Sequence, residues 1–201
     1  MASASIVTNG GFETGDLTGW TYAGSGTTPG IGITVLTTGG SNTTGYGDAV
    51  PNYEGTHAAF FVDDNAQESI SQSVALSGGQ QYTLSFALYA TASGAANPFS
   101  FTLASSVGAD VLSSLTNSSS TTDVPVGVWT LYTYVFTVAA TDSYQLSMNF
   151  SSGATPSKDV LIDAVDISAV PLPAGVVLLG SGLAAAFGAG AVRRRKATKA
   201  A

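Results

Sequence analysis

Few residues in this chain are able to act as acids, bases or nucleophiles. His57 is the only histidine and no cysteine is present, so a general base active at neutral pH would be His57 or a carboxylate. Asp63 and Asp64 are adjacent, and adjacent side chains in a strand point to opposite faces, so they do not form an acid–base pair. We expect an exposed or hydrogen-bonded His57, and the two aspartates in a loop or as minor calcium ligands.

Composition permits a Ser/His/Asp triad through His57, but no G-x-S-x-G nucleophile motif accompanies it. A glycosidase would need two carboxylates held roughly 5 to 10 Å apart in a cleft, and nothing in the sequence marks such a pair. The absence of cysteine removes thiolate nucleophiles, thiolate metal sites and disulfides. We therefore predict a binding protein rather than an enzyme, with a glycoside-active enzyme as the alternative.

Positive and negative charges occupy different parts of the chain. Before residue 193, Lys158 is the only cation among 13 carboxylates, which gives this part a net charge of −12. Residues 193–201 contain the other five cations. An acidic surface repels phosphate backbones, so nucleic acid is not expected as a partner.

Alternating apolar and polar residues predict antiparallel strands before residue 168. The clearest alternation is in Gln81–Tyr89 and Tyr144–Phe150. Weaker runs are Ile31–Leu36, His57–Val62, Ser69–Leu76, Phe99–Leu103, Val111–Leu115, Trp129–Val138 and Val160–Ile167. Turn-rich segments separate these runs, and no helical period appears before residue 172. The predicted fold class is all-β, a two-sheet antiparallel jelly-roll-like sandwich.

Aromatic residues on such a sandwich have two possible roles. Trp20, Tyr22, Trp129 and Tyr132 have the flat rings that stack on sugars. Aromatics of a sandwich more often belong to its core, and we expect that role for most of them.

The C-terminal segment differs from everything before it. Residues 172–192 carry no charge, and as a helix they would measure about 31 Å, close to the thickness of a bilayer's hydrocarbon core. The basic residues that follow would stay in the cytoplasm and leave the body outside. A buried hairpin or core helix is an alternative, although consecutive cations suit a buried end poorly. A permanent membrane anchor is another.

This segment resembles the PEP-CTERM class of bacterial sorting tails, in the variant whose box reads VPLPA. The matching residues are Val170, Pro171, Leu172, Pro173 and Ala174, then the apolar run, then Arg193, Arg194, Arg195 and Lys196. The resemblance implies recognition by an exosortase-like membrane protease, cleavage near the box, and a Gram-negative host that makes extracellular polysaccharide.

The body carries a second resemblance. N-G-G-F-E at residues 9–13, G-D-L-T-G-W at 15–20, Y-T-L-S-F at 82–86 and V-L-I-D-A-V at 160–165 resemble galactose-binding-like jelly rolls, including carbohydrate-binding modules. That resemblance implies a structural calcium ion held by Glu13 and Asp163.

Asp163 is expected to share an apolar face with Leu161, Val165 and Ile167, where a carboxylate needs a partner. Ala164 departs from the pattern, which often has a second aspartate there. The alternative is a surface Glu13 and an Asp163 bonded to a backbone amide.

These observations predict three parts. Residues 1–5 are the remainder of an export signal, since Ala2, Ser3 and Ala4 look like a cleavage site. Residues 6–168 form the sandwich, and residues 169–201 form the sorting signal, with a transmembrane helix at 172–192 and a basic tail at 193–201. The predicted function is an exported cell-surface or matrix protein that binds carbohydrate, with extracellular polysaccharide as a partner. An uncleaved periplasmic protein anchored in the inner membrane is the alternative.

Overall fold

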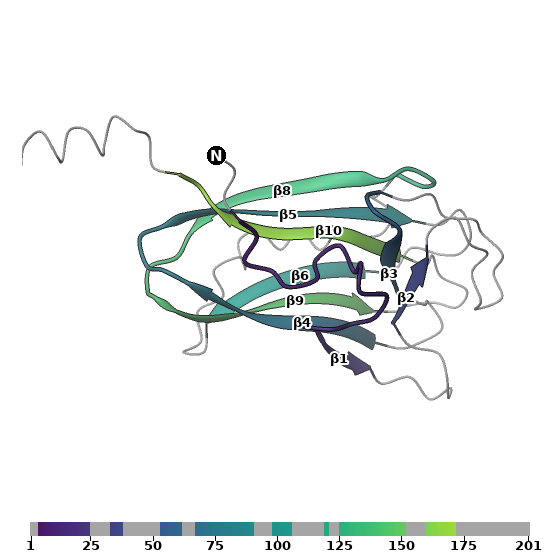
Figure 1. The fold of residues 1–201 in the computed structure, drawn as a ribbon, viewed down its shortest axis with the longest axis horizontal. Helices are drawn as coiled ribbons and strands as arrows, with labels where there is room; N and C mark the ends of the chain where they lie inside the picture. Colours follow the sequence, from purple (N-terminus) through teal and green to yellow (C-terminus); the bar gives the residue numbers. More distant parts are fainter. Residues whose placement is uncertain are drawn as a thin grey trace, which may run out of the picture. The chain divides into compact units, whose positions relative to one another are not determined.

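The computed structural model describes residues 4–24, 33–37, 53–61, 67–90, 98–105, 119–120, 125–151 and 160–171. Ten strands lie in these ranges (Figure 1). They are β1 (Thr21–Gly24), β2 (Thr34–Thr37), β3 (His57–Phe61), β4 (Gln67–Leu76), β5 (Gln81–Ala90), β6 (Pro98–Ser105), β7 (Ser119–Ser120), β8 (Thr130–Thr137), β9 (Asp142–Ser151) and β10 (Val160–Ala169).

The strands form two five-stranded sheets. Sheet A has the order β1-β4-β9-β6-β7, and sheet B has the order β2-β3-β10-β5-β8. Every pairing between named strands is antiparallel. Figure 1 shows the two sheets as stacked layers, with β8, β5 and β10 above β6, β9 and β4. The predicted all-β, two-sheet antiparallel sandwich is confirmed, whereas the short strands β1 and β7 were not predicted.

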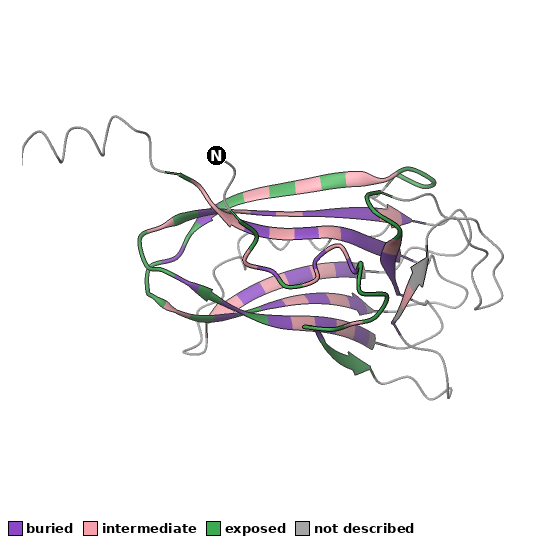
Figure 2. Ribbon diagram, in the orientation of Figure 1, coloured by how far each residue is buried: buried purple, intermediate pink, exposed green. Residues whose placement is uncertain are grey.

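The core between the sheets consists of every second side chain along the strands. On β5 the side chains of Tyr82, Leu84, Phe86 and Leu88 are buried, and on β9 every second residue from Tyr144 to Phe150 is buried. Figure 2 shows the same alternation of buried and intermediate residues along β5, β6 and β9. The ring of Phe86 lies 5.0 Å from that of Phe101 across the sandwich. Aromatic packing therefore joins the two sheets directly.

A bulge interrupts the alternation in β10. The pairing of β10 with β5 shifts between Asp163 and Asp166, and Ala164 adopts a left-handed conformation with φ 52°. An extra residue in a strand reverses the face of everything after it. Ile162 and Val165 consequently both reach the core between the sheets.

The bulge corrects one prediction about Asp163. Leu161 belongs to a small cluster on the outer face of sheet B, while Val165 and Ile167 belong to the core between the sheets. Asp163 therefore does not share a face with all three of these residues. The physical reason is that the extra residue at Ala164 lies between Asp163 and Val165, which unbroken period-two counting does not anticipate.

Residues 5–20, which we call the opening loop, join the two sheets at one edge. Ile6 N–H donates to the Ile167 carbonyl at 2.8 Å, on sheet B. The Gln72 side chain on sheet A accepts from Thr8 N–H at 2.7 Å and donates to the carbonyls of Thr8 and Gly19, both at 2.9 Å. These bonds hold the opening loop to both layers.

The chain divides into two units, residues 1–169 and residues 170–201. Only residues 170 and 171 of the second unit are described, so the predicted span at 172–192 and the basic tail lie outside the described residues. In the ranges given above, no helix is long and apolar enough to cross a membrane. The predicted strand at residues 111–115 and the pair Asp63 and Asp64 also fall outside them.

Candidate functional site

The opening loop owes its shape to side chains that replace missing backbone partners. The Asn9 side chain donates to the carbonyls of Asp16 and Thr18, both at 3.1 Å, and accepts from Thr14 N–H at 3.3 Å. Phe12, fully buried, stacks on Trp20 with 5.8 Å between ring centroids. The local sequence thus turns Glu13 away from this packed face, toward the segment that precedes β3.

Glu13 binds that segment through both carboxylate oxygens. Its Oε1 accepts from the N–H groups of Thr56 and His57, both at 2.9 Å, and its Oε2 accepts from the Thr56 hydroxyl at 3.0 Å. The two backbone donors, Thr56 first, hold the pKa of Glu13 below its usual value because they stabilise the charged form. The Glu13 side chain remains 46% exposed.

Asp163 binds the same segment through the backbone of Glu54. Its Oδ2 accepts from Glu54 N–H at 3.2 Å, and its Oδ1 accepts from its neighbour Ala164 N–H at 2.6 Å. The residue is completely buried. Burial raises the pKa of Asp163 to about 7, the two amide donors oppose that rise, and the charges of Glu54 and Glu13 add to it.

Gly11 lies among three carboxylate side chains. A Cβ placed on Gly11 would lie 3.2 Å from Glu54 Oε1, 3.8 Å from Asp163 Oδ1 and 3.8 Å from Glu13 Cγ. A side chain at this position would therefore take up the space between the three groups. We call Glu13, Glu54 and Asp163 the carboxylate cluster.

The cluster has the chemistry that suits a hard cation, since its polar groups are oxygens. The residues fit a cation in one further respect, because burial raises the pKa of Asp163 to about 7 and a neighbouring positive charge would stabilise its charged form. Among the described residues, however, no group of three or more His, Cys, Asp and Glu side chains is arranged to hold a metal. An ion here would also need backbone carbonyls or water.

Glu13 and Asp163 thus meet on one segment, residues 54–57, and each also has the feature expected in the absence of an ion. Glu13 is at the surface and Asp163 accepts backbone amides. Calcium binding by this pair stays a prediction. His57 is the satisfied ring that we expected, with its Nδ1 2.9 Å from the Thr56 hydroxyl and 3.5 Å from Glu13 Oε2.

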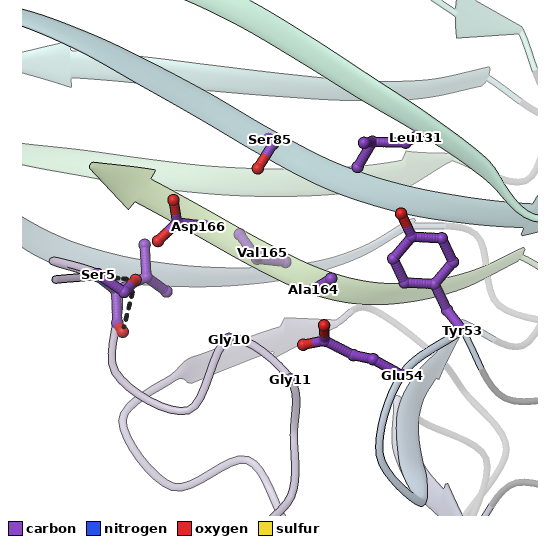
Figure 3. A pocket seen from close by; sticks show the side chains of 11 residues that line it. Ser5, Gly10, Gly11, Tyr53, Glu54, Ser85, Leu131, Ala164, Val165 and Asp166 are labelled. Atoms are coloured by element: carbon purple, nitrogen blue, oxygen red, sulfur yellow. Dashed lines mark hydrogen bonds between the residues drawn. The ribbon is translucent and has the colours of Figure 1, made fainter. Parts of the chain in front are cut away.

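A hollow of about 380 Å³ lies beside the carboxylate cluster, on the outer face of sheet B (Figure 3). Its floor comes from Ser85 on β5 and from Ala164 to Asp166 on β10. Figure 3 shows Tyr53 at one end, Leu131 on β8 above the floor, and the Glu54 carboxylate directed toward the floor from the opposite side. Ser5, Val7, Gly10 and Gly11 of the opening loop complete the lining.

An aromatic series supports one end of the hollow. The Tyr53 ring lies 5.7 Å from Trp129, and Trp129 lies 5.4 Å from Tyr89. Tyr89 and Trp129 pack in turn on a buried cluster made of Ala58, Phe60 and Leu161. Of the four aromatics considered from sequence, Trp20 is in the core, Tyr132 packs against it, Trp129 supports Tyr53 and Tyr22 is exposed.

Sequence reasoning missed Tyr53, Glu54 and Asp166. Tyr53 and Glu54 lie in an irregular segment, and Asp166 reaches the hollow only because the bulge turns it outward. Gly10 and Gly11 were the available signal, because consecutive glycines often mark a place where the backbone approaches other groups closely.

The sandwich, its opening loop and the hollow define a jelly-roll domain of the kind found in carbohydrate-binding modules. The HpiC1-like family, described as HpiC1 cyclase, matches residues 2–168, and the chain belongs to this family. The jelly roll was predicted from the sequence, whereas this family was not. A comparison with curated proteins found no significant match.

Three solved structures show how widely this fold is shared. The module TmCBM61 in complex with β-1,4-galactotriose is 17% identical, covers 84% of this chain and 100% of its own, and has a TM-score of 0.58. The CBM22-1 xylan-binding domain of Paenibacillus barcinonensis Xyn10C is 17% identical, with coverages of 86% and 98% and a TM-score of 0.55. A Stig cyclase, Fisc from Fischerella sp. TAU, bound to a pyrrolidinylidene indole, is 15% identical, with coverages of 86% and 100% and a TM-score of 0.55. At these identities the likeness concerns the fold.

Proposed function

We propose that this protein is a non-catalytic carbohydrate-binding protein of the cell surface or extracellular matrix. The observation that carries the proposal is a jelly roll matched over the whole length of a galactotriose-bound module and nearly all of a xylan-binding domain. The hollow supports it, since aromatic and polar groups together are the usual lining of a ligand site.

A glycan-binding screen tests this proposal. The full-length protein, held in a detergent without a sugar headgroup, is applied to an array of neutral, acidic and amino-sugar polysaccharides, with and without calcium. Binding to one class above the level of a heat-unfolded control is the expected result. Absence of binding to every glycan in both conditions contradicts it.

We further propose a structural calcium ion at the carboxylate cluster, with Glu13 and Asp163 as its ligands. When bound, calcium would supply positive charge to a buried carboxylate and link the opening loop to β10. A ligand present at 100 times its Kd stabilises the folded state by about 2.7 kcal/mol. Calcium should therefore raise Tm measured at pH 8, magnesium should raise it less, and Asp163→Asn should reduce the rise. Equal Tm values with calcium and with a chelator would argue against the ion.

For residues 169–201 the proposal is a sorting signal. The motif Val170 to Ala174, the uncharged run and the basic residues 193–196 occur in the order that exosortase-like proteases recognise. The test is the mass of the mature protein in hosts with and without such a protease. Loss of the residues after the motif only when the protease is present is the expected result. An intact C-terminus in both hosts would favour the permanent anchor.

Membership of the HpiC1-like family makes a cyclase the second candidate function. In the described part of the chain, Asp163 is the carboxyl whose pKa is raised to about 7, but it is completely buried and bonded to backbone amides. Asp163 does not line the hollow, so its carboxyl does not contact an organic molecule bound there. Titration with the indole compound found in the Fischerella enzyme separates the candidates, because binding of the indole without binding of any glycan would favour the cyclase.

A further inference from the structure

We propose that the hollow on the outer face of sheet B is the sugar site, and that it takes a pyranose ring of an uncharged polysaccharide. This inference rests on the proposed function and adds the place, the residues and the charge of the ligand. A volume of about 380 Å³ is at the small end of the range for ligand pockets, and it corresponds to about one or two sugar rings.

Two carboxylates in the hollow can accept hydrogen bonds from a sugar. Glu54 and Asp166 both line the hollow, Glu54 from the segment before β3 and Asp166 from β10. Within the part of the chain that the structure describes, no hydrogen bond or ion pair engages either side chain. Each carboxylate therefore has oxygens available to accept hydrogen bonds from hydroxyl groups of a ligand. Bonds to an ionised acceptor are about twice as strong as bonds between neutral groups.

The aromatic end of the hollow offers a flat surface on which a sugar ring can pack. Tyr53 is 36% exposed. Its ring packs against the ring of Trp129, which in turn packs against the ring of Tyr89. A ring held in this way loses little side-chain entropy when a ligand packs on it. The apolar face of a pyranose suits such a surface, and the exposed Leu131 offers a further apolar contact nearby.

The charge of the hollow favours uncharged sugars over acidic ones. The residues that line the hollow include two carboxylates and no Lys or Arg, and the chain before residue 193 has a net charge of −12. A uronate would bring a third carboxylate into this space, and like charges placed together are repelled. Uncharged sugars avoid this cost and still donate hydroxyl hydrogen bonds to Glu54 and Asp166.

The experiment is calorimetric titration of the full-length protein with β-1,4-galactotriose, xylohexaose and cellohexaose, and with the galactotriose oxidised to the uronate at C6. At least one neutral oligosaccharide should bind, and the uronate should bind about tenfold more weakly than galactotriose if galactotriose is the ligand. Higher salt should narrow that difference, because ions screen the repulsion. For xylohexaose or cellohexaose, carboxymethylated forms serve as the anionic counterparts.

Variants locate the site. Tyr53→Ala and Asp166→Asn should each weaken binding about tenfold, whereas Tyr53→Phe keeps the ring and should lose less. Leu131→Ala should weaken binding about threefold. The matched control is Val135→Ala, since Val135 is an exposed apolar residue on the same strand but outside the hollow. Asp142→Asn removes the same charge as Asp166→Asn at a distance from the hollow.

The outcomes separate the two proposals. If the wild-type protein binds none of the neutral oligosaccharides, both the carbohydrate function and this site are wrong. If it binds one, but Tyr53→Ala, Asp166→Asn and Leu131→Ala bind as tightly as Val135→Ala, the function stands and the assigned site is wrong. Equal affinity for a neutral oligosaccharide and its anionic form would overturn the charge selection. Thermal melting of each variant separates loss of the site from loss of the fold.

Discussion

Two regions of the molecule differ in how they are held together. One is the interior between the two sheets, and the other is the junction of the opening loop with β10. Between the sheets, alternating residues of β5 and β9 are buried, the pairings of β5 with β8 and of β9 with β4 are regular, and ring contacts such as Phe86 on Phe101 join the layers. At the junction, glycines approach other groups, Ala164 takes a left-handed conformation, and a buried carboxylate has a raised pKa.

That difference indicates where function is expected. Strain and buried charge persist in a fold only when their surroundings hold them in place, and they concentrate at sites that bind or react. The junction contains the carboxylate cluster and borders the hollow. If this comparison is right, interior substitutions act on stability, and junction substitutions act on stability, pH dependence and binding together.

The largest effect is expected in the interior, for Phe86→Ala. Phe86 is 1% exposed, and its ring lies 5.7 Å from Tyr132, 6.0 Å from Tyr134 and 5.0 Å from Phe101. Truncating a buried phenylalanine costs about 3 to 5 kcal/mol, because burial is lost and a cavity remains. Urea unfolding followed by tryptophan fluorescence measures the loss. Val135→Ala is the exposed control, and a loss of similar size there would contradict this account of the interior.

The interior was also the part that sequence predicted best. The runs at residues 81–89 and 144–150 alternate without interruption, and the structure confirms both their strands and their buried faces. A sandwich core requires one buried face on each strand, so apolar and polar residues alternate along the sequence of the strand.

The junction was predicted less completely, for physical reasons. Glu13 and Asp163 were singled out from a resemblance, but the prediction that Asp163 shares a face with Val165 and Ile167 was wrong, because the bulge at Ala164 leaves no mark in a period-two pattern. Tyr53 and Glu54 lie in an irregular segment, where position depends on distant partners such as the Asp163 carboxylate rather than on local sequence.

The second effect is a change in pH dependence caused by Asp163→Asn. The pKa of Asp163 is raised to about 7 when folded, above an unfolded value of about 3.9. The folded state therefore holds a proton that the unfolded state has lost between these pH values. Stability from this group is complete below about pH 4, falls as pH rises to about 7, and levels off above it. We expect the fall to be on the order of 2 to 4 kcal/mol without calcium.

Urea unfolding of wild type and Asp163→Asn across pH 4 to 8, in chelator, measures this effect. Asparagine does not titrate, so the variant should lack this part of the fall while keeping the contributions of the other carboxylates. Subtracting the two curves isolates Asp163. Parallel curves would show that the folded pKa of Asp163 is not raised. The junction would then not differ from the interior in its electrostatics.

The third effect is steric, for Gly10→Ala. A Cβ on Gly10 would overlap the Val165 carbonyl oxygen, and Val165 N–H donates to the Gly10 carbonyl at 3.0 Å. Accommodating a methyl group would separate the opening loop from β10, and overpacking of this kind costs about 1 to 3 kcal/mol. Because Gly10 lines the hollow, the variant should also weaken glycan binding. Unaltered stability and binding would show that the approach is looser than the structure indicates.

The smallest effect is expected for the same substitution in a regular turn, Gly79→Ala. Gly79 lies between β4 and β5 with φ 76°, and a Cβ there would meet no atom within 4 Å. Its N–H donates to the Val138 carbonyl at 2.8 Å, and alanine keeps that donor. Only the left-handed backbone is penalised, at about 1 kcal/mol, with no effect on glycan binding. Gly79→Asn should lose less than Gly79→Ala, because asparagine tolerates this conformation. A loss at Gly79→Ala as large as that at Gly10→Ala would mean that backbone strain, rather than the contact with Val165, accounts for both.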